Sequence, residues 1–192
     1  MRVFWADVSA LDAAQTLRPG RTKANGSAFA WTLLELAARE VWGLERLPET
    51  ALSPAGKPYF PAHPELHFSV SHTRGAVLVA LSHAPVGADV ERRREIPDVV
   101  RRRLREVEPG DLELFELWTL RESWFKLTGR GDLRDIPFAR SGGVLIPPNP
   151  SALCRLYDTI PGCAAAVCSL RDLPPEKLIR VDPAQLVRRT ED

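Results

Sequence analysis

The sequence predicts an α+β protein in which helices and antiparallel strands occupy separate stretches of the chain. Two segments carry apolar residues at helical spacing, and each of them precedes a group of short β-like runs. With 192 residues, of which 44% are hydrophobic and 27% charged, the chain is long enough for one large domain or two small lobes.

The first helix is predicted over residues 27–43. Gly26 and Ser27 are typical of a helix start, and Gly43 is typical of a helix end. Its apolar stripe comprises Leu33, Leu34, Ala37, Val41 and Leu44. The next segment, residues 52–64, contains four prolines and one glycine and is therefore predicted to be a loop.

Three β-like runs follow this loop. They are residues 66–72, 76–82 and 86–91. Because the links between them are short, we predict a β-meander. Successive antiparallel strands reverse direction, so His72 is expected at the same edge as Asp89 and Glu91, roughly 10 Å away. Side chains alternate along a strand, which places Asp89 and Glu91 on one face.

Asp89 and Glu91 end an otherwise apolar run and are followed at once by three arginines. Two carboxylates so close together repel each other unless a cation lies between them. Magnesium suits such a pair, because it takes a few protein carboxylates and completes its shell with water and phosphate oxygens. The alternative is a solvent-exposed acidic pair that contacts the arginines, and the triplet alone favours that alternative.

The second helix is predicted over residues 111–128 and is closed by Gly129. Its buried surface is assigned to Leu114, Leu117, Trp118, Trp124, Phe125 and Leu127. Thr119, Glu122 and Lys126 fall on one face of this mostly apolar helix and form a narrow polar stripe. The alternative is an ordinary ion pair between Glu122 and Lys126 on a solvated face.

Four blocks of the chain occur in the order and approximate spacing of the surfactin-type 4'-phosphopantetheinyl transferases. They are GKPYFP, FSVSH, VGADVE and WTLRESWFKLTGRG. The chain resembles this family from about residue 20 to the AAAVCSL strand near residue 170. The residues that match the family's two diagnostic blocks are Gly87, Asp89 and Glu91 in the strand, and Trp118, Glu122 and Lys126 in the helix. Arg121 stands where the family has lysine, which keeps the charge.

The resemblance implies an enzyme that moves the phosphopantetheine arm of coenzyme A onto a serine of an apo acyl or peptidyl carrier protein, releasing adenosine 3',5'-bisphosphate. It implies that Asp89, Glu91 and Glu122 hold magnesium on the diphosphate of coenzyme A. Lys126 would stabilise charge on that diphosphate, and Glu122 would accept the serine proton directly or through a metal-bound water.

The resemblance also implies a coenzyme A site on the preceding loop and strand. Ser71 and His72 match a pair that contacts the phosphates, so His72 joins Glu122 and Lys126 among the expected catalytic residues. Lys57 and Pro58 match a loop that lies along the adenine ring. The alternative for His72 is a capping or hydrogen-bonded histidine without contact to phosphate.

The resemblance implies that basic residues before the first helix bind the 3'-phosphate of coenzyme A, and we assign this role to Arg21 and Lys23. Trp31 stands where a relative often has arginine. The alternative for both cations is that they are solvated loop charges.

The family fold implied by the resemblance has two similar lobes, each a long helix on a small antiparallel sheet, related by a pseudo-twofold axis. Residues 1–95 would form the N-terminal lobe and residues 96–192 the C-terminal lobe, with the active site in the cleft between them. A basic helix at residues 92–105 would dock the acidic carrier protein, or it would only provide a solubilising face.

The net charge of +1 argues against a nucleic-acid partner, and the N-terminus lacks the pattern of a signal peptide. We therefore expect a cytoplasmic monomer without a membrane partner. The three cysteines form no C-x-x-C pair and are expected to be reduced core residues. Two rival functions remain open, a magnesium-dependent phosphohydrolase of a nucleotide-like diphosphate and a non-catalytic basic binding module.

Overall fold

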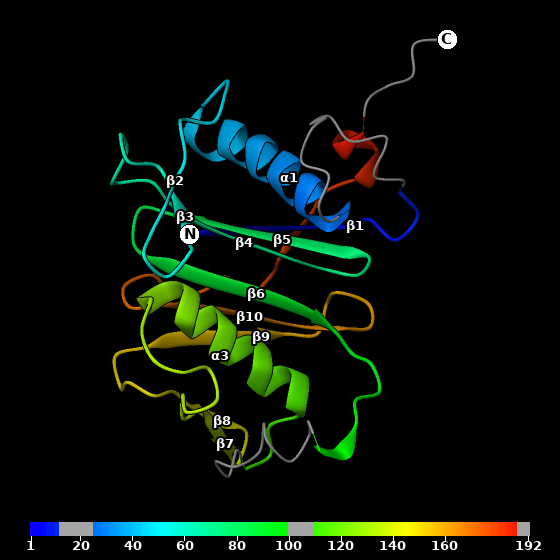
Figure 1. Ribbon diagram of the computed structural model, residues 1–192, viewed down its shortest axis with the longest axis vertical. Helices are drawn as coiled ribbons and strands as arrows, with labels where there is room; N and C mark the ends of the chain where they lie inside the picture. Colours follow the sequence, from blue (N-terminus) through cyan, green and yellow to red (C-terminus); the bar gives the residue numbers. More distant parts are fainter. Residues whose placement is uncertain (12–24, 100–109, 188–192) are drawn as a thin grey trace.

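The computed structural model describes residues 1–11, 25–99 and 110–187, and it confirms the α+β class (Figure 1). The main helices of this part of the chain are α1 (Asn25–Trp42), α3 (Leu114–Thr128) and the 3-10 helix η2 (Pro183–Leu186). Both long helices lie close to their predicted bounds. No helix among these residues is long and apolar enough to cross a membrane.

Two main sheets carry most of the strands. The first has the order β11-β1-β5-β4 and contains β1 (Arg2–Asp7), β4 (His67–Thr73), β5 (Ala76–Ser82) and β11 (Ile179–Arg180). The second has the order β6-β10-β9 and contains β6 (Val86–Arg92), β9 (Leu153–Tyr157) and β10 (Cys163–Ser169). Neighbouring strands are antiparallel except β1 and β11, which are parallel.

Two short hairpins lie outside these sheets. One pairs β2 (Ala51–Leu52) with β3 (Pro58–Tyr59), and the other pairs β7 (Ala139–Ser141) with β8 (Val144–Ile146). The first hairpin falls within the segment predicted as a loop. It turns at Gly56, whose φ of 79° is readily available only to glycine.

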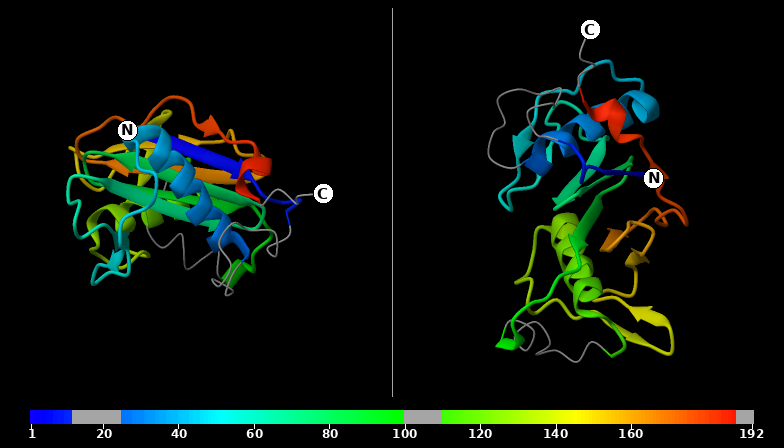
Figure 2. Two further views of the ribbon diagram at one scale, coloured as in Figure 1. Left: turned by 90° about the horizontal axis from the view of Figure 1, so that it is seen from above. Right: turned by 90° about the vertical axis from the view of Figure 1, so that its right-hand side faces the viewer.

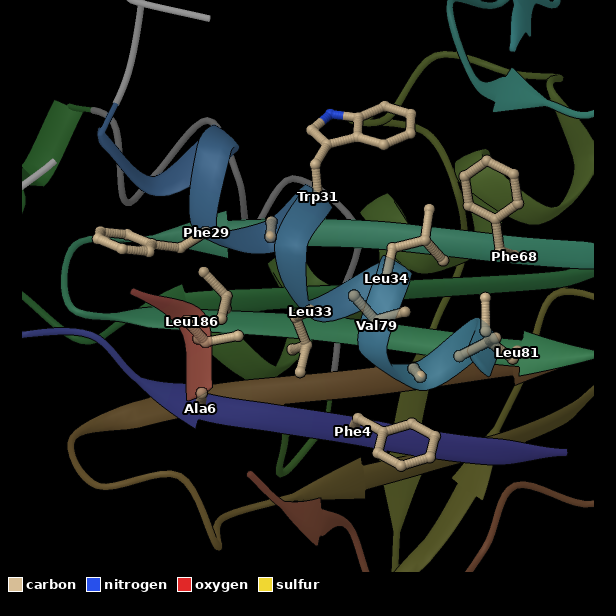
Figure 3. Close-up of a cluster of buried hydrophobic side chains, with 14 of the residues drawn as sticks. Phe4, Ala6, Phe29, Trp31, Leu33, Leu34, Phe68, Val79, Leu81 and Leu186 are labelled. Carbon is tan, nitrogen blue, oxygen red and sulfur yellow. The ribbon is translucent and has the colours of Figure 1, made fainter. Parts of the chain in front are cut away.

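Three clusters of buried side chains show how the layers stack. The first cluster lies between α1 and the four-stranded sheet, the second between the two sheets, and the third between the three-stranded sheet and α3. The layers therefore run helix, sheet, sheet, helix (Figures 1 and 2). Figure 3 shows the first cluster, in which Leu33 and Leu34 of α1 lie against β5.

The predicted β-meander is wrong in its third strand. β4 and β5 pair as expected, but β6 pairs with β10 in the other sheet, with Asp89 opposite Ala166 and Glu91 opposite Ala164. The reason is that β5 has no free edge, because β1 already pairs with it on the side away from β4. The three-residue link after β5 therefore carries the chain from one sheet to the next.

The cysteines follow the prediction. All three are free, with Cys163 and Cys168 buried in β10 and Cys154 partly buried in the neighbouring strand. Burial raises the pKa of both buried thiols, which keeps them protonated at neutral pH.

Candidate active site

The crossing of α3 over β6 depends on Gly87. A Cβ atom at this position would overlap the carbonyl oxygen of Ser123 and would lie 2.7 Å from the amide nitrogen of Leu127. The helix backbone therefore rests directly on the strand, which only a residue without a side chain allows. This close approach brings the predicted polar face of α3 to Asp89.

Lys126 makes the main contact between the two predicted blocks. Its Nζ lies 2.7 Å from Asp89 Oδ1 and 3.3 Å from the carbonyl oxygen of Ala88. Asp89 is only 5% exposed, so the alternative of a solvated acidic pair is wrong for this residue. A buried carboxylate needs such a partner, because desolvation strongly penalises an isolated charge.

Hydroxyl side chains of β4 cover the free edge of β6. Each accepts a hydrogen bond from an outward-pointing backbone N–H of β6, and the same spacing recurs three times along the two strands. The pairs are Ser69 Oγ with Ala88 N at 2.9 Å, Ser71 Oγ with Val90 N at 3.2 Å, and Thr73 Oγ1 with Arg92 N at 3.1 Å. We call these three residues the hydroxyl ladder. It satisfies backbone donors that a sheet edge would otherwise leave unpaired.

Two members of the hydroxyl ladder also contact the predicted carboxylates. Ser71 Oγ donates to Asp89 Oδ1 at 2.7 Å, and Thr73 Oγ1 donates to Glu91 Oε2 at 3.3 Å. Arg94 donates to the same oxygen of Glu91 at 3.2 Å. Ser71 is thus buried, with its hydroxyl group on Asp89. Its expected contact with a coenzyme A phosphate stays a prediction.

The acidic residues provide donor chemistry that fits a hard divalent cation. Asp89 Oδ2 is buried and has no hydrogen-bond partner among the described residues. Burial raises the pKa of Glu122, and the charges of Asp89 and Glu91 raise it further against the opposing effect of Lys126. An unpaired oxygen and mutual repulsion are both relieved by a bound cation.

The three carboxylates are not, however, gathered around one point. Within the ranges that the structure describes, no three His, Cys, Asp or Glu side chains are close enough to hold a metal ion. The cation that lies on Asp89 is the ammonium group of Lys126. The three-carboxylate magnesium site therefore stays a prediction.

A cavity of about 300 Å³ lies between the 55–58 turn, β4 and α3. It is lined by Ala55, Gly56, Lys57, Pro58, Ser69, Val70, Glu122, Phe125 and Lys126. The cavity therefore brings Lys57 and Pro58 close to Glu122 and Lys126. These residues come from distant segments, and the family resemblance assigned all four to the coenzyme A site. Phe125, Val70 and Ser69 were not assigned to the site from the sequence.

Lys57 is held in an unusual environment at this cavity. Its Nζ donates to the carbonyl oxygen of Val86 at 2.6 Å. Burial, and to a smaller extent the nearby charge of Lys126, together lower the pKa of Lys57 to about 8. Two ammonium groups that repel each other at one cavity favour an anionic ligand.

His72 follows Ser71 on β4. Partial desolvation lowers the pKa of its imidazole, and Lys126 acts in the same direction, while Asp89 and Glu91 act in the opposite direction. His72 is therefore within electrostatic reach of Lys126, Asp89 and Glu91. With its pKa below 6.5, the imidazole is neutral at pH 7 and can offer a hydrogen bond but not a charge.

Other predicted residues lie elsewhere or outside the described ranges. Arg21 and Lys23 fall in segment 12–24, which is not described. Trp31 is buried and meets Phe68 edge to face, with 6.1 Å between ring centroids (Figure 3). Arg121 is buried on α3 and donates from Nε to the carbonyl oxygen of Ile136.

The first three arginines of the basic segment 92–105 make hydrogen bonds or ion pairs with other parts of the molecule. Arg92 donates to the carbonyl oxygen of Arg74, Arg93 pairs with Glu113, and Arg94 pairs with Glu91. Residues 100–109 lie outside the described ranges, so the remainder of this segment stays a prediction.

The hydroxyl ladder includes two residues, Ser69 and Thr73, that the sequence reasoning missed. A signal was present, because Ser69, Ser71 and Thr73 alternate along a strand that continues into the charged site. Such alternation is usually attributed to a solvated sheet face. Here the hydroxyls instead bind the backbone of β6, because β6 belongs to the other sheet and its edge lies against β4.

A half-buried lysine pair beside interacting carboxylates and a cavity is typical of an enzyme site for an anionic substrate.

No family model matches the chain. It is 28% identical over 151 residues to 4'-phosphopantetheinyl transferase Sfp of Bacillus subtilis strain 168, covering 69% of this chain and 67% of that protein. It is 29% identical over 157 residues to another 4'-phosphopantetheinyl transferase of Bacillus subtilis, covering 71% of this chain and 70% of the relative.

A shorter match has a higher identity. The chain is 36% identical over 87 residues to the 4'-phosphopantetheinyl transferase gsp of Aneurinibacillus migulanus, and this match covers 40% of this chain and 36% of that protein. The chain is therefore similar to the surfactin-type 4'-phosphopantetheinyl transferases, and these relatives support an enzyme of this type. In the first two matches, the aligned region spans about two thirds of the length of the relative.

Proposed function

We propose that the protein transfers the 4'-phosphopantetheine group of coenzyme A to a serine hydroxyl of an apo acyl or peptidyl carrier protein. The relatives are named for this group transfer. The observation that carries the proposal for this chain is the cavity that joins Lys57 and Pro58 to Glu122 and Lys126, with Asp89 paired to Lys126 beside it.

Coenzyme A would enter this cavity with its diphosphate toward the two lysines. Lys57 and Lys126 provide positive charge at the cavity, and Pro58 and Phe125 provide apolar surface for the adenine ring. His72 is proposed to face the phosphates from β4, whereas the hydroxyl proton of Ser71, which the resemblance also assigns to the phosphates, is directed at Asp89. Arg21 and Lys23 are proposed as the ligands of the 3'-phosphate.

The reaction needs an attacking oxygen, a proton acceptor and charge stabilisation. The serine oxygen of the carrier forms a bond to the phosphorus that bears the pantetheine arm. The bond from this phosphorus to the bridging oxygen breaks, and adenosine 3',5'-bisphosphate leaves with the bonding electron pair. Lys126 would stabilise the charge that develops on the diphosphate.

Glu122 is the proposed acceptor of the serine proton. Burial and neighbouring carboxylates raise its pKa above the usual value of 4.5, which makes it a stronger base than an exposed glutamate. It also lines the cavity that would hold the diphosphate. Transfer of the proton to Glu122 leaves the carrier joined to phosphopantetheine through a neutral seryl oxygen.

Asp89, Glu91 and Glu122 are proposed to hold magnesium, which would supply charge neutralisation at the diphosphate. The unpaired oxygen of Asp89 supports this assignment. The metal held by the three acids and the ammonium group of Lys126 would then contact the same diphosphate. This arrangement would explain why β6 presents Asp89 to Lys126 of α3.

Residues 1–95 and 96–192 would form the lobes of a cytoplasmic monomer, with β6 of the first completing the sheet of the second. An acidic carrier protein would dock near segment 92–105, so that its serine reaches the diphosphate.

Mass spectrometry of an apo carrier protein incubated with coenzyme A, magnesium and the enzyme tests the proposal. A mass gain of one phosphopantetheine, together with adenosine 3',5'-bisphosphate in solution, is the expected result. Release of inorganic phosphate without a change of the carrier would instead indicate a phosphohydrolase. Binding without either product would leave only a binding module. A panel of apo carriers from fatty-acid, polyketide and peptide synthesis should be compared, because their acceptor surfaces differ.

A further inference from the structure

Ser71 and Thr73 each repeat one bonding pattern against β6. Each hydroxyl oxygen accepts from the backbone N–H of one residue and donates to the carboxylate of the residue before it. For Ser71 the two groups are Val90 N and Asp89 Oδ1, and for Thr73 they are Arg92 N and Glu91 Oε2. The backbone donor thus fixes the direction in which the only hydroxyl proton points.

Ser69 provides an internal comparison within the hydroxyl ladder. It accepts from Ala88 N in the same way, but the preceding residue of β6 is Gly87, which has no carboxylate. Its hydroxyl proton points instead to the carbonyl oxygen of Ala88, 3.4 Å away. Covering the edge of β6 therefore needs a hydroxyl at all three positions, whereas contact with an acid occurs only at Ser71 and Thr73.

The hydroxyl contacts are confined to one oxygen of each carboxylate. Asp89 Oδ1 receives Ser71 and Lys126, while Oδ2 is buried without a partner among the described residues. On Glu91, Thr73 and Arg94 both contact Oε2. Each acid is thus anchored through one oxygen, and its other oxygen can serve a ligand in the site.

We propose that Ser71 and Thr73 are positioning residues that hold the carboxylates of Asp89 and Glu91 in the orientation that binds a divalent cation. This role rests on the proposed function only in treating the two acids as metal ligands. Hydrogen bonds to the ligand side chain fix its orientation and commonly change metal affinity by 10-fold or more. Thr73 has no assigned role in the proposed transfer mechanism, so it provides the sharper test.

The test measures Mn²⁺ binding to the full chain without coenzyme A, by electron paramagnetic resonance of free Mn²⁺. Replacement Thr73→Val keeps the shape but removes the hydroxyl, and we expect Mn²⁺ affinity to fall about 10-fold. Thr73→Ser restores the hydroxyl and should recover most of the affinity. Ser71→Ala should lower affinity at least as much, because its bond to Asp89 is shorter and buried.

Ser69→Ala is the matched control for the structural part of the hydroxyl ladder. It should lower the thermal midpoint as Ser71→Ala does, because each change leaves a backbone N–H of β6 without its partner. It should leave Mn²⁺ affinity unchanged. Equal loss of Mn²⁺ affinity in all three alanine or valine variants would overturn the proposal, since the effect would then be general destabilisation.

A double-mutant cycle locates the effect on Glu91. In a Glu91→Ala background, Thr73→Val should cause no further loss of Mn²⁺ affinity, because the group that it orients is absent. The same 10-fold loss in that background would show that Thr73 acts elsewhere and would reject the positioning role. Unchanged affinity in Thr73→Val alone would reject it as well.

The outcome can be separated from the proposed function. If the unmodified enzyme transfers phosphopantetheine but Thr73→Val binds Mn²⁺ and turns over normally, only the positioning role fails. If the unmodified enzyme transfers nothing but the Mn²⁺ series behaves as expected, the positioning role holds and the transferase function fails. In an active enzyme, Thr73→Val should raise the Mg²⁺ concentration needed for half-maximal rate while Thr73→Ser restores it.

Discussion

Lys126 Nζ lies 2.7 Å from Asp89 Oδ1 although 37 residues separate the two in sequence. This ion pair joins the helix and the strand that carry the family's two diagnostic blocks. Gly87 makes it possible, because a side chain there would hold the helix away from the strand. The ion pair and the glycine therefore both hold α3 against β6, and each contribution can be tested separately.

Lys126→Met should cost both activity and stability. The change removes the cation proposed for the diphosphate, so kcat/KM should fall at least about 100-fold. It also leaves the buried carboxylate of Asp89 without its cation, which should lower the free energy of unfolding by about 2 kcal/mol. Lys177→Met is the control, since Lys177 is an exposed lysine outside the cavity. Steady-state kinetics and urea unfolding measure the two effects, and full activity of Lys126→Met would contradict the proposed role.

Gly87→Ala should be more damaging than a glycine substitution that only strains the backbone. The new methyl group would overlap the carbonyl oxygen of Ser123, so α3 must move away from β6. We expect the unfolding free energy to fall by about 3 kcal/mol, as in severe overpacking. Gly43→Ala has open space but a φ of 68°, and should lose only about 1 kcal/mol. Similar losses in the two variants would argue against a tight crossing at Gly87.

The predicted site residues were easier to find than their arrangement. Helix α3 and strand β6 follow from local periodicity. The site roles of Gly87, Asp89, Glu122 and Lys126 were inferred from the family resemblance, because the local patterns alone favoured solvated acids and an ordinary ion pair. Local patterns cannot reveal that β1, from the start of the chain, occupies the second edge of β5 and sends β6 to another sheet. The contact of the hydroxyl ladder with the acids depends on that long-range pairing, which explains why it was missed.

The cavity illustrates the same limit. Nothing local distinguishes Lys57 from any other loop lysine, and its role was inferred only from the family resemblance. Its low pKa arises because the hairpin of β2 and β3 presses it against β6 and near Lys126. These contacts join residues far apart in the chain, so the environment of Lys57 becomes visible only in the folded structure.

Coenzyme A binding should weaken as the pH rises through about 8, because Lys57 loses its positive charge there. The stability effect has the opposite sign. Between pH 8 and 10.5 the unfolded chain binds more protons at Lys57 than the folded chain does, so this group adds stability as pH rises. Calorimetric titration of coenzyme A at several pH values measures the first effect, and urea unfolding measures the second.

Lys57→Met is the matched variant for both pH effects. It should bind coenzyme A more weakly at pH 7 and should lose the additional weakening near pH 8. If the variant keeps the same pH dependence as the unmodified protein, another group is responsible and Lys57 is not the relevant cation.

Glu122→Gln should separate catalysis from stability. If Glu122 accepts the serine proton, the amide cannot replace it, and kcat should fall by roughly 100-fold or more. The unmodified enzyme should lose activity as pH falls and Glu122 becomes protonated, whereas the residual activity of the variant should lack this limb. Control reactions with Glu176→Gln, an exposed glutamate, should match the unmodified enzyme.

Stability should change in the opposite direction in the same Glu122→Gln variant. The folded pKa of Glu122 lies above its unfolded value, so its stabilising contribution is complete below pH 4.5 and is lost as pH rises through the folded pKa. At pH 7 the ionised carboxylate is therefore unfavourable, since burial and the charges of Asp89 and Glu91 oppose it. The neutral amide removes this repulsion, and the variant should unfold at a higher temperature than the unmodified protein in metal-free buffer. A fall in its thermal midpoint would mean that Lys126 attracts Glu122 more strongly than burial and the two acids oppose its charge.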